Sequence, residues 1–153
     1  MKKIFLAMTV LMMGSHAFAD VATSSIPMSI EIPKQCTISN LPTAMILQEN
    51  GAYSVGNYSV TCNTPYTIFT DNRNWANDWY SYVANAQNEW IETGVSTIAL
   101  RDNTAVPLHA GTPLARQGYA IDHYQVLIRA SARITLGMRA GVYTDDYLIR
   151  IDY

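Results

Sequence analysis

The stretch Val142-Tyr-Thr-Asp-Asp-Tyr-Leu-Ile-Arg-Ile-Asp-Tyr153 alternates in character from Tyr147 onward. Because successive side chains of a strand point to opposite faces, this period of two predicts a strand with one buried face. The sequence ends there, so we expect a sheet edge that needs protection or that accepts a strand from elsewhere. The predicted buried face carries Tyr147, Ile149, Ile151 and Tyr153, and the other face carries Leu148, Arg150 and Asp152.

A second alternating segment, Ile26-Pro-Met-Ser-Ile-Glu-Ile32, lies near the other end of the sequence. Its apolar positions are Ile26, Met28, Ile30 and Ile32, separated by Pro27, Ser29 and Glu31. This pattern also predicts a strand, although Pro27 weakens it because proline has no N–H to donate to a sheet.

The first nineteen residues have the features of a secretory signal peptide. Lys2 and Lys3 precede a short apolar core, and Ala17-Phe-Ala19 is a small-x-small cleavage site. The alternative is an uncleaved N-terminal anchor, but the apolar run is too short to span a membrane, and no later segment approaches that length. We therefore expect an exported protein with a signal peptide at 1–19, a separate strand segment at 20–33 and one domain at 34–153.

Charge and composition limit the classes of partner. The full chain has 10 Lys+Arg and 12 Asp+Glu, and removal of Lys2 and Lys3 leaves 10 − 2 = 8 basic residues, a net charge of 8 − 12 = −4. No basic cluster is present to hold phosphates, which argues against nucleic acid as a partner.

The sequence contains two cysteines, Cys36 and Cys62. In an oxidising compartment an isolated pair is expected to form a disulfide, whereas a metal site would need further ligands at suitable spacing. The closed loop would stabilise the fold by roughly 3 kcal/mol in the chain-entropy view.

Short segments of period two, separated by Gly, Pro and Asn turns, occur along the rest of the chain. We expect Gly56 to mark a bulge and 71–89 to be loop with one short strand. No segment shows a sustained helical period, so seven or eight strands predict an all-β sandwich. The predicted strands are 36–38, 53–62, 66–70, 80–83, 95–100, 105–108, 119–134 and 147–153.

The residues needed for catalysis do not form a recognisable set. His109 and His123 are the histidines after the signal, and no Gly-x-Ser-x-Gly elbow, metal-binding histidine pair or phosphate loop occurs. Asp145 and Asp146 would point to opposite faces of a strand, which makes them poor partners. The sequence therefore predicts no enzyme activity, no metal and no cofactor.

The region 71–92 is rich in aromatic residues. Exposed aromatic rings stack on sugars and bury large area at low entropic cost, so they are candidates for binding a surface or a carbohydrate. The alternative, which we favour, is that one or two tryptophans close an end of the sandwich and the rest lie in a loop. The candidates are Trp75, Trp79, Tyr80 and Trp90.

Three features together resemble the spore coat protein U family of pilins, the subunits of archaic chaperone–usher pili. Alternating residues run from the signal into Cys36, a second cysteine ends Tyr58-Ser-Val-Thr-Cys62, and Ala140-Gly-Val-Tyr-Thr-Asp leads into the final strand. The last of these is the most specific. The middle, 71–116, matches little of the family pattern, and Pro27 departs from it.

The resemblance implies an incomplete immunoglobulin-like sandwich that lacks its last strand. A periplasmic chaperone would lend the missing strand, and at an outer-membrane usher the N-terminal segment of the next subunit would replace it. The donor residues would be Ile26, Met28, Ile30 and Ile32, and the acceptor groove would be lined by Ile38, Tyr147, Ile149, Ile151 and Tyr153. Head-to-tail repetition would build a fibre on the bacterial surface.

Two other functions remain open from the sequence. One is a minor or tip subunit of the same fold that adheres through the aromatic region. The other is a self-complete secreted carbohydrate-binding sandwich, in which 26–32 folds back as an edge strand.

Overall fold

The computed structural model describes residues 25–109 and 113–153, so the predicted signal peptide lies outside the described residues. The chain divides into two units, 1–31 and 32–153. In the first unit the described residues, 25–31, form no strand, and Ile26, Met28 and Ile30 are 85%, 94% and 86% exposed. All strands of the described residues lie in the second unit.

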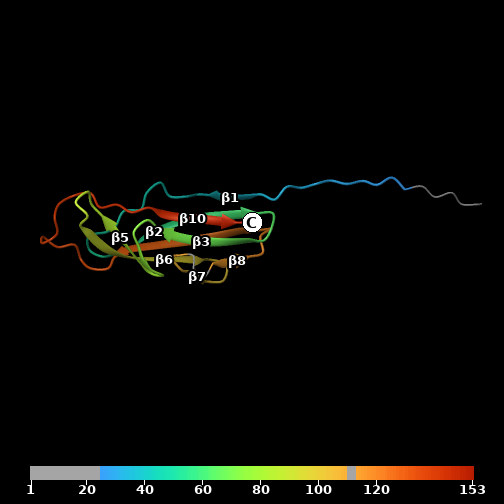
Figure 1. Cartoon of the computed structure of the whole chain (residues 1–153). Coiled ribbons are helices and arrows are strands. Elements are labelled where there is room, and N and C mark those ends of the chain that lie inside the picture. The colour runs from blue at the N-terminus through green and yellow to red at the C-terminus, as the bar shows by residue number, and fades with distance from the viewer. Residues whose placement is uncertain (1–24, 110–112) are drawn as a thin grey trace, which may run out of the picture. The chain divides into compact units, whose positions relative to one another are not determined.

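All regular structure in the described residues is β-strand (Figure 1). The elements are β1 (Cys36–Ser39), β2 (Ser54–Cys62), β3 (Tyr66–Asn72), β4 (Trp75–Asn77), β5 (Tyr80–Ala84), β6 (Trp90–Ala99), β7 (Thr104–Val106), β8 (Leu114–Arg116), β9 (Ile121–Ala130) and β10 (Tyr147–Asp152).

Within the described residues the strands form two sheets, and every pair of neighbouring strands is antiparallel. The larger sheet has the order β1-β2-β9-β6-β5-β4, and β7 pairs with β6 beside that path. The smaller sheet has the order β10-β3-β8, and β10 (red) runs alongside β3 in Figure 1. β1 is an edge strand of the larger sheet, and β10 is an edge strand of the smaller one.

The core lies between the sheets because both contribute apolar residues at alternate positions. From the larger sheet, Tyr58, Val95 and Val126 are buried, and from the smaller sheet Tyr66 and Ile68 join the same cluster. Tyr58 and Tyr124 stack with ring centroids 5.1 Å apart. The chain is therefore an all-β antiparallel sandwich, as the strand pattern of the sequence predicts, and it is consistent with the immunoglobulin-like fold that the resemblance implies.

The structure corrects three details of the predicted elements. The described residues form ten strands rather than seven or eight, because β4 and β8 were not expected. The predicted strand 119–134 is shorter, since β9 ends at Ala130. Gly56 marks no bulge, because β2 keeps its register with β9 through the pair Gly56↔Val126.

A glycine fits at position 56 because the segment that links β1 and β2 packs closely against it. A Cβ at this position would lie 2.8 Å from Met45 Sδ and 3.1 Å from Pro42 Cγ. This glycine therefore lets the linking segment lie directly against β2.

Candidate functional site

A cavity of about 660 Å³ lies between the two sheets. Tyr147 and Ile149 of β10 line it from the smaller sheet. Tyr58, Val95, Val126 and Ile128 line it from the larger sheet. The cavity is largely apolar in its lining, and its position beside β10 places it at an edge of the sandwich rather than at its centre.

Neither edge strand beside this region has a partner on its outer side within the described residues. β10 pairs only with β3, in register from Tyr147↔Asn72 to Asp152↔Thr67, and β1 pairs only with β2. The unpaired side of β10 therefore offers backbone N–H and C=O groups to an added strand.

The burial pattern of β10 matches an open edge. Tyr147, Ile149 and Ile151 pack against the core but remain partly exposed, while Leu148, Arg150 and Asp152 on the other face are exposed. The alternation is the one that the sequence predicts. Its inward residues are less completely covered than those of β2 and β9, where Tyr58 and Tyr124 are almost fully buried.

The other residues predicted for an acceptor groove fall in different places. Ile38 on β1 and Ile151 on β10 pack against the same core cluster, although neither lines the cavity. Tyr153 follows the end of β10 and is 55% exposed. Ile32 is exposed, like the other three predicted donor residues.

The segment between β1 and β2 contributes to the cavity and was not predicted to do so. Met45 packs against the core, and Pro42 and Ile46 also line the cavity. The Ser54 hydroxyl donates a hydrogen bond to the Ile46 carbonyl, which ties this segment to β2. The sequence signal was the short apolar run 44–47, which by itself does not say what the run covers.

Two tyrosine hydroxyls lie at the cavity. The Tyr147 hydroxyl is 2.6 Å from Thr97 Oγ1, and burial raises the pKa of Tyr147. The buried Tyr58 hydroxyl has no hydrogen-bond partner among the described residues, and burial raises its pKa as well. Both phenols are therefore neutral at physiological pH, and the cavity wall that they form carries no charge.

Asp145 lines the cavity and joins the end of β3 to β5. Its carboxylate accepts hydrogen bonds from Asn72 Nδ2 (2.7 Å), Asn74 N (3.1 Å) and Ser81 Oγ (2.6 Å). Asp146, which also lines the cavity, pairs instead with the exposed Arg73. The two carboxylates therefore act separately, as their adjacent positions predict.

Cys36 and Cys62 form the predicted disulfide. They are directly opposite each other in the β1–β2 register. The bond holds the short edge strand β1 onto β2, which places Ile38 against the core.

The histidines do not build a Ser/His/Asp set. His123 Nδ1 lies 2.9 Å from Ser59 Oγ on the outer side of the larger sheet. The neighbouring Asp122 points inward, where it accepts a hydrogen bond from the Tyr66 hydroxyl at 2.7 Å and lies 2.9 Å from Arg101. The acid is thus on the opposite face from the Ser–His pair and cannot orient the imidazole.

The four candidate aromatic residues are divided among three places. Trp75 stacks on His109 with ring centroids 4.1 Å apart, and Trp90 packs edge-on against Tyr82. Trp79 and Tyr80 lie together on the outer face of the larger sheet, beside a small trough. All four are partly exposed.

Within 25–109 and 113–153, no three side chains of the His, Cys, Asp and Glu types come together as metal ligands. No helix in that part of the chain is long and apolar enough to cross a membrane.

Comparison with known proteins identifies similar structures but no sequence family. No family model matches the chain, and no curated protein matches it. Among solved structures, a chain of the chaperone–tip adhesin complex of CFA/I fimbriae matches with a TM-score of 0.47 and 12% identity over 76% of this chain.

A second structural match is a chain of the CsuC–CsuE chaperone–tip adhesion subunit pre-assembly complex, from the archaic chaperone–usher Csu pili of Acinetobacter baumannii. Its TM-score is 0.50, with 13% identity over 80% of this chain. This chain spans 40% of the length of each of these two neighbours. At such identities the likeness concerns the fold alone: the chain is an antiparallel β-sandwich of the kind found in this pilus pre-assembly complex.

Proposed function

We propose that the protein is a structural subunit of a bacterial surface pilus, assembled by the chaperone–usher route through exchange of donor strands. The observation that carries the proposal is the apolar cavity beside the unpaired edge of β10. A sandwich with an open edge and part-exposed core residues is stabilised by an added strand, which supplies both backbone partners and apolar side chains.

The segment 26–32 has the chemistry of such a strand. Its apolar residues recur at every second position, as do Tyr147, Ile149 and Ile151 on β10. Alternate residues of two extended strands have the same spacing, roughly 6.6 Å, so donor side chains and acceptor positions stay in step. Each aliphatic side chain that becomes buried contributes roughly 1.5–3 kcal/mol. In the structure these side chains are exposed, and they are therefore available to another molecule.

The structural neighbours support the same route. Both matches are chains from complexes of a chaperone with a tip subunit, and one of these belongs to archaic chaperone–usher pili. The partners that we propose are a periplasmic chaperone, an outer-membrane usher and further copies of pilin subunits. Because each subunit would donate at one end and accept at the other, the contact is heterologous and builds an open fibre. We further propose that the protein is a member of the spore coat protein U family of pilins.

Removal of the donor segment tests the proposal. A chain of residues 34–153, exported behind the native signal peptide and expressed with its chaperone and usher, should bind the chaperone and fail to form fibres. The full chain with Ser29→Asp is the matched control, because this charge lies on the polar face of the segment, whereas Ile30→Asp places it on the apolar face. We expect fibres from Ser29→Asp and none from Ile30→Asp.

Other outcomes would favour other functions. Normal fibres from 34–153 would disprove the assignment of the donor. A full chain that is a stable monomer without any chaperone would support the self-complete sandwich instead. Fibres that carry the protein only at one end would identify it as a tip or minor subunit.

A further inference from the structure

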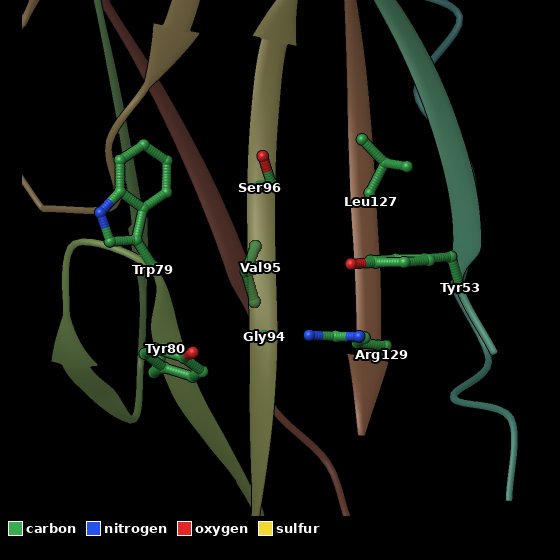
Figure 2. A pocket seen from close by; sticks show the side chains of 8 residues that line it. All are labelled: Tyr53, Trp79, Tyr80, Gly94, Val95, Ser96, Leu127 and Arg129. Atoms are coloured by element: carbon green, nitrogen blue, oxygen red, sulfur yellow. The ribbon is translucent and has the colours of Figure 1, made fainter. Parts of the chain in front are cut away.

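The outer face of the larger sheet carries a small trough, of about 140 Å³, which is separate from the cavity between the sheets. We define the trough by Tyr53, Trp79, Tyr80, Gly94, Ser96 and Arg129, which line it together with Val95 and Leu127. Figure 2 shows Trp79 and Tyr80 on one side of β6 and Tyr53 and Arg129 on the other.

The strand register creates this trough. Gly94 on β6 is directly opposite Tyr80 on β5 and directly opposite Arg129 on β9. Side chains at such positions share one face of the sheet, so a residue without a side chain stands between two large ones. Gly94 is therefore the floor, and the neighbouring side chains are the walls.

The aromatic wall is held in place by its own turn. Asn77 Oδ1 accepts hydrogen bonds from the backbone N–H groups of Trp79 (3.0 Å) and Tyr80 (3.1 Å). The Trp79 carbonyl in turn accepts from Val95 N at 2.9 Å. The backbone of Trp79 is thereby fixed to β6, although its side chain is 43% exposed. A positioned but exposed indole is typical of a binding surface rather than of a core.

The opposite wall carries a positive charge. The Arg129 guanidinium lies over the Tyr53 ring, 4.9 Å from its centroid. Such stacking uses the face of the guanidinium and leaves its in-plane N–H groups free to donate. In the described part of the chain no carboxylate lies within ion-pair distance of Arg129, and the trough lining contains no acidic residue.

We propose that this trough binds a carboxylated pyranose, such as a hexuronic acid residue of an acidic glycan. Aromatic walls stack on the C–H face of a sugar ring, the Ser96 hydroxyl can exchange hydrogen bonds with sugar hydroxyls, and Arg129 matches a carboxylate in a bidentate pair. Because the trough is on the outer face, it does not depend on the donor strand, and the inference stands apart from the proposed function.

The test compares two sugars that differ only at C6. Methyl glucuronide carries a carboxylate there and methyl glucoside carries a hydroxymethyl group. Binding of each to the full exported chain, in the assembly in which it is purified, is measured by ligand-observed NMR titration. We expect millimolar binding with a preference of about tenfold for the glucuronide, as charge-assisted bidentate pairing implies. Equal affinity for the two sugars, or no binding of either, would overturn the proposal.

Three substitutions locate the site. Arg129→Gln should remove the preference for glucuronide, Trp79→Ala should weaken both sugars, and Gly94→Val should abolish binding of both by filling the floor. Strand β6 has room for the Cβ of a valine at position 94, because a Cβ there would meet only the Arg129 side chain, at 3.6 Å.

Matched controls separate the trough from general surface charge and aromaticity. Arg150 also lies over an aromatic ring, 4.1 Å from the centroid of Phe69, but on the smaller sheet. Trp90 is an exposed indole of β6 outside the trough. Arg150→Gln and Trp90→Ala should leave both affinities unchanged, with near-UV circular dichroism confirming the fold of every variant. Unchanged binding in Arg129→Gln and Gly94→Val would disprove the assignment.

Discussion

At the scale of single residues, Asp145 shows how one carboxylate joins parts of the chain that are distant in sequence. It binds the side chain of Asn72 at the end of β3, the backbone of Asn74 and the hydroxyl of Ser81 on β5. Because Asn72 and Ser81 are buried, loss of the carboxylate leaves polar groups without a partner.

We therefore predict that Asp145→Ala lowers the free energy of unfolding by about 2 kcal/mol. Asp146→Ala is the control, since it breaks an exposed ion pair with Arg73 and should cost less than about 1 kcal/mol. Urea denaturation followed by tryptophan fluorescence measures both. Equal losses for the two variants would contradict the separate roles of these neighbours.

A second residue-scale prediction concerns acid stability. The Arg116 guanidinium, 2.7 Å from Asp102, and the hydrogen bonds of Thr104 hold the pKa of the Asp102 carboxyl well below its usual range. A lowered pKa in the folded state stabilises the protein above the ordinary pKa of about 3.9, and this contribution is lost as pH falls toward the lowered value.

The stability difference between the wild type and Asp102→Asn should therefore be largest above about pH 4 and shrink as the pH is lowered further. Urea titrations at a series of pH values measure this difference. A stability difference that stays constant down to the lowest pH measured would show that the ion pair with Arg116 does not lower the pKa of Asp102.

At the scale of elements, β10 is the strand whose two faces have the most distinct roles. Ile149 lines the cavity, while its neighbour Leu148 is exposed on the outer face. We predict that Ile149→Asp prevents fibre formation, because the charge would meet an incoming apolar strand, and that Leu148→Asp does not. Electron microscopy of cells and chaperone co-purification provide the two readouts. Fibres from Ile149→Asp would exclude this side of β10 as the acceptor.

Elements with a clear period of two were predictable, and two of the very short ones, β4 and β8, were not. β2, β3, β6, β9 and β10 alternate over six or more residues, so each strand carries its own signal. β4 and β8 have three residues each, too few to show a period. Their strand character comes from partners elsewhere in the chain, since Trp75 pairs with Ser81 and Ala115 with Thr67.

At the scale of the whole molecule, the proposal requires that the sandwich gain stability from a separate strand. We predict that a peptide of residues 25–33 raises the unfolding midpoint of the 34–153 chain. Binding to the folded state alone adds about 2.7 kcal/mol when the peptide is at 100 times its dissociation constant. The same peptide with Ile30→Asp should have little effect. No shift with the native peptide would mean that the open edge does not accept this segment.

The sequence by itself determined which face of each long strand turns inward, the pairing of the two cysteines and the all-β class, because alternation and cysteine number are local or countable properties. Only the tertiary structure decided that β1 is the edge of the larger sheet, that 41–47 lines the cavity, and that Trp79 and Arg129 lie on either side of Gly94. These are outcomes of strand order and register between residues far apart in the chain, such as Tyr147 with Asn72, and a periodic pattern says which way a side chain points but not which strand lies beside it.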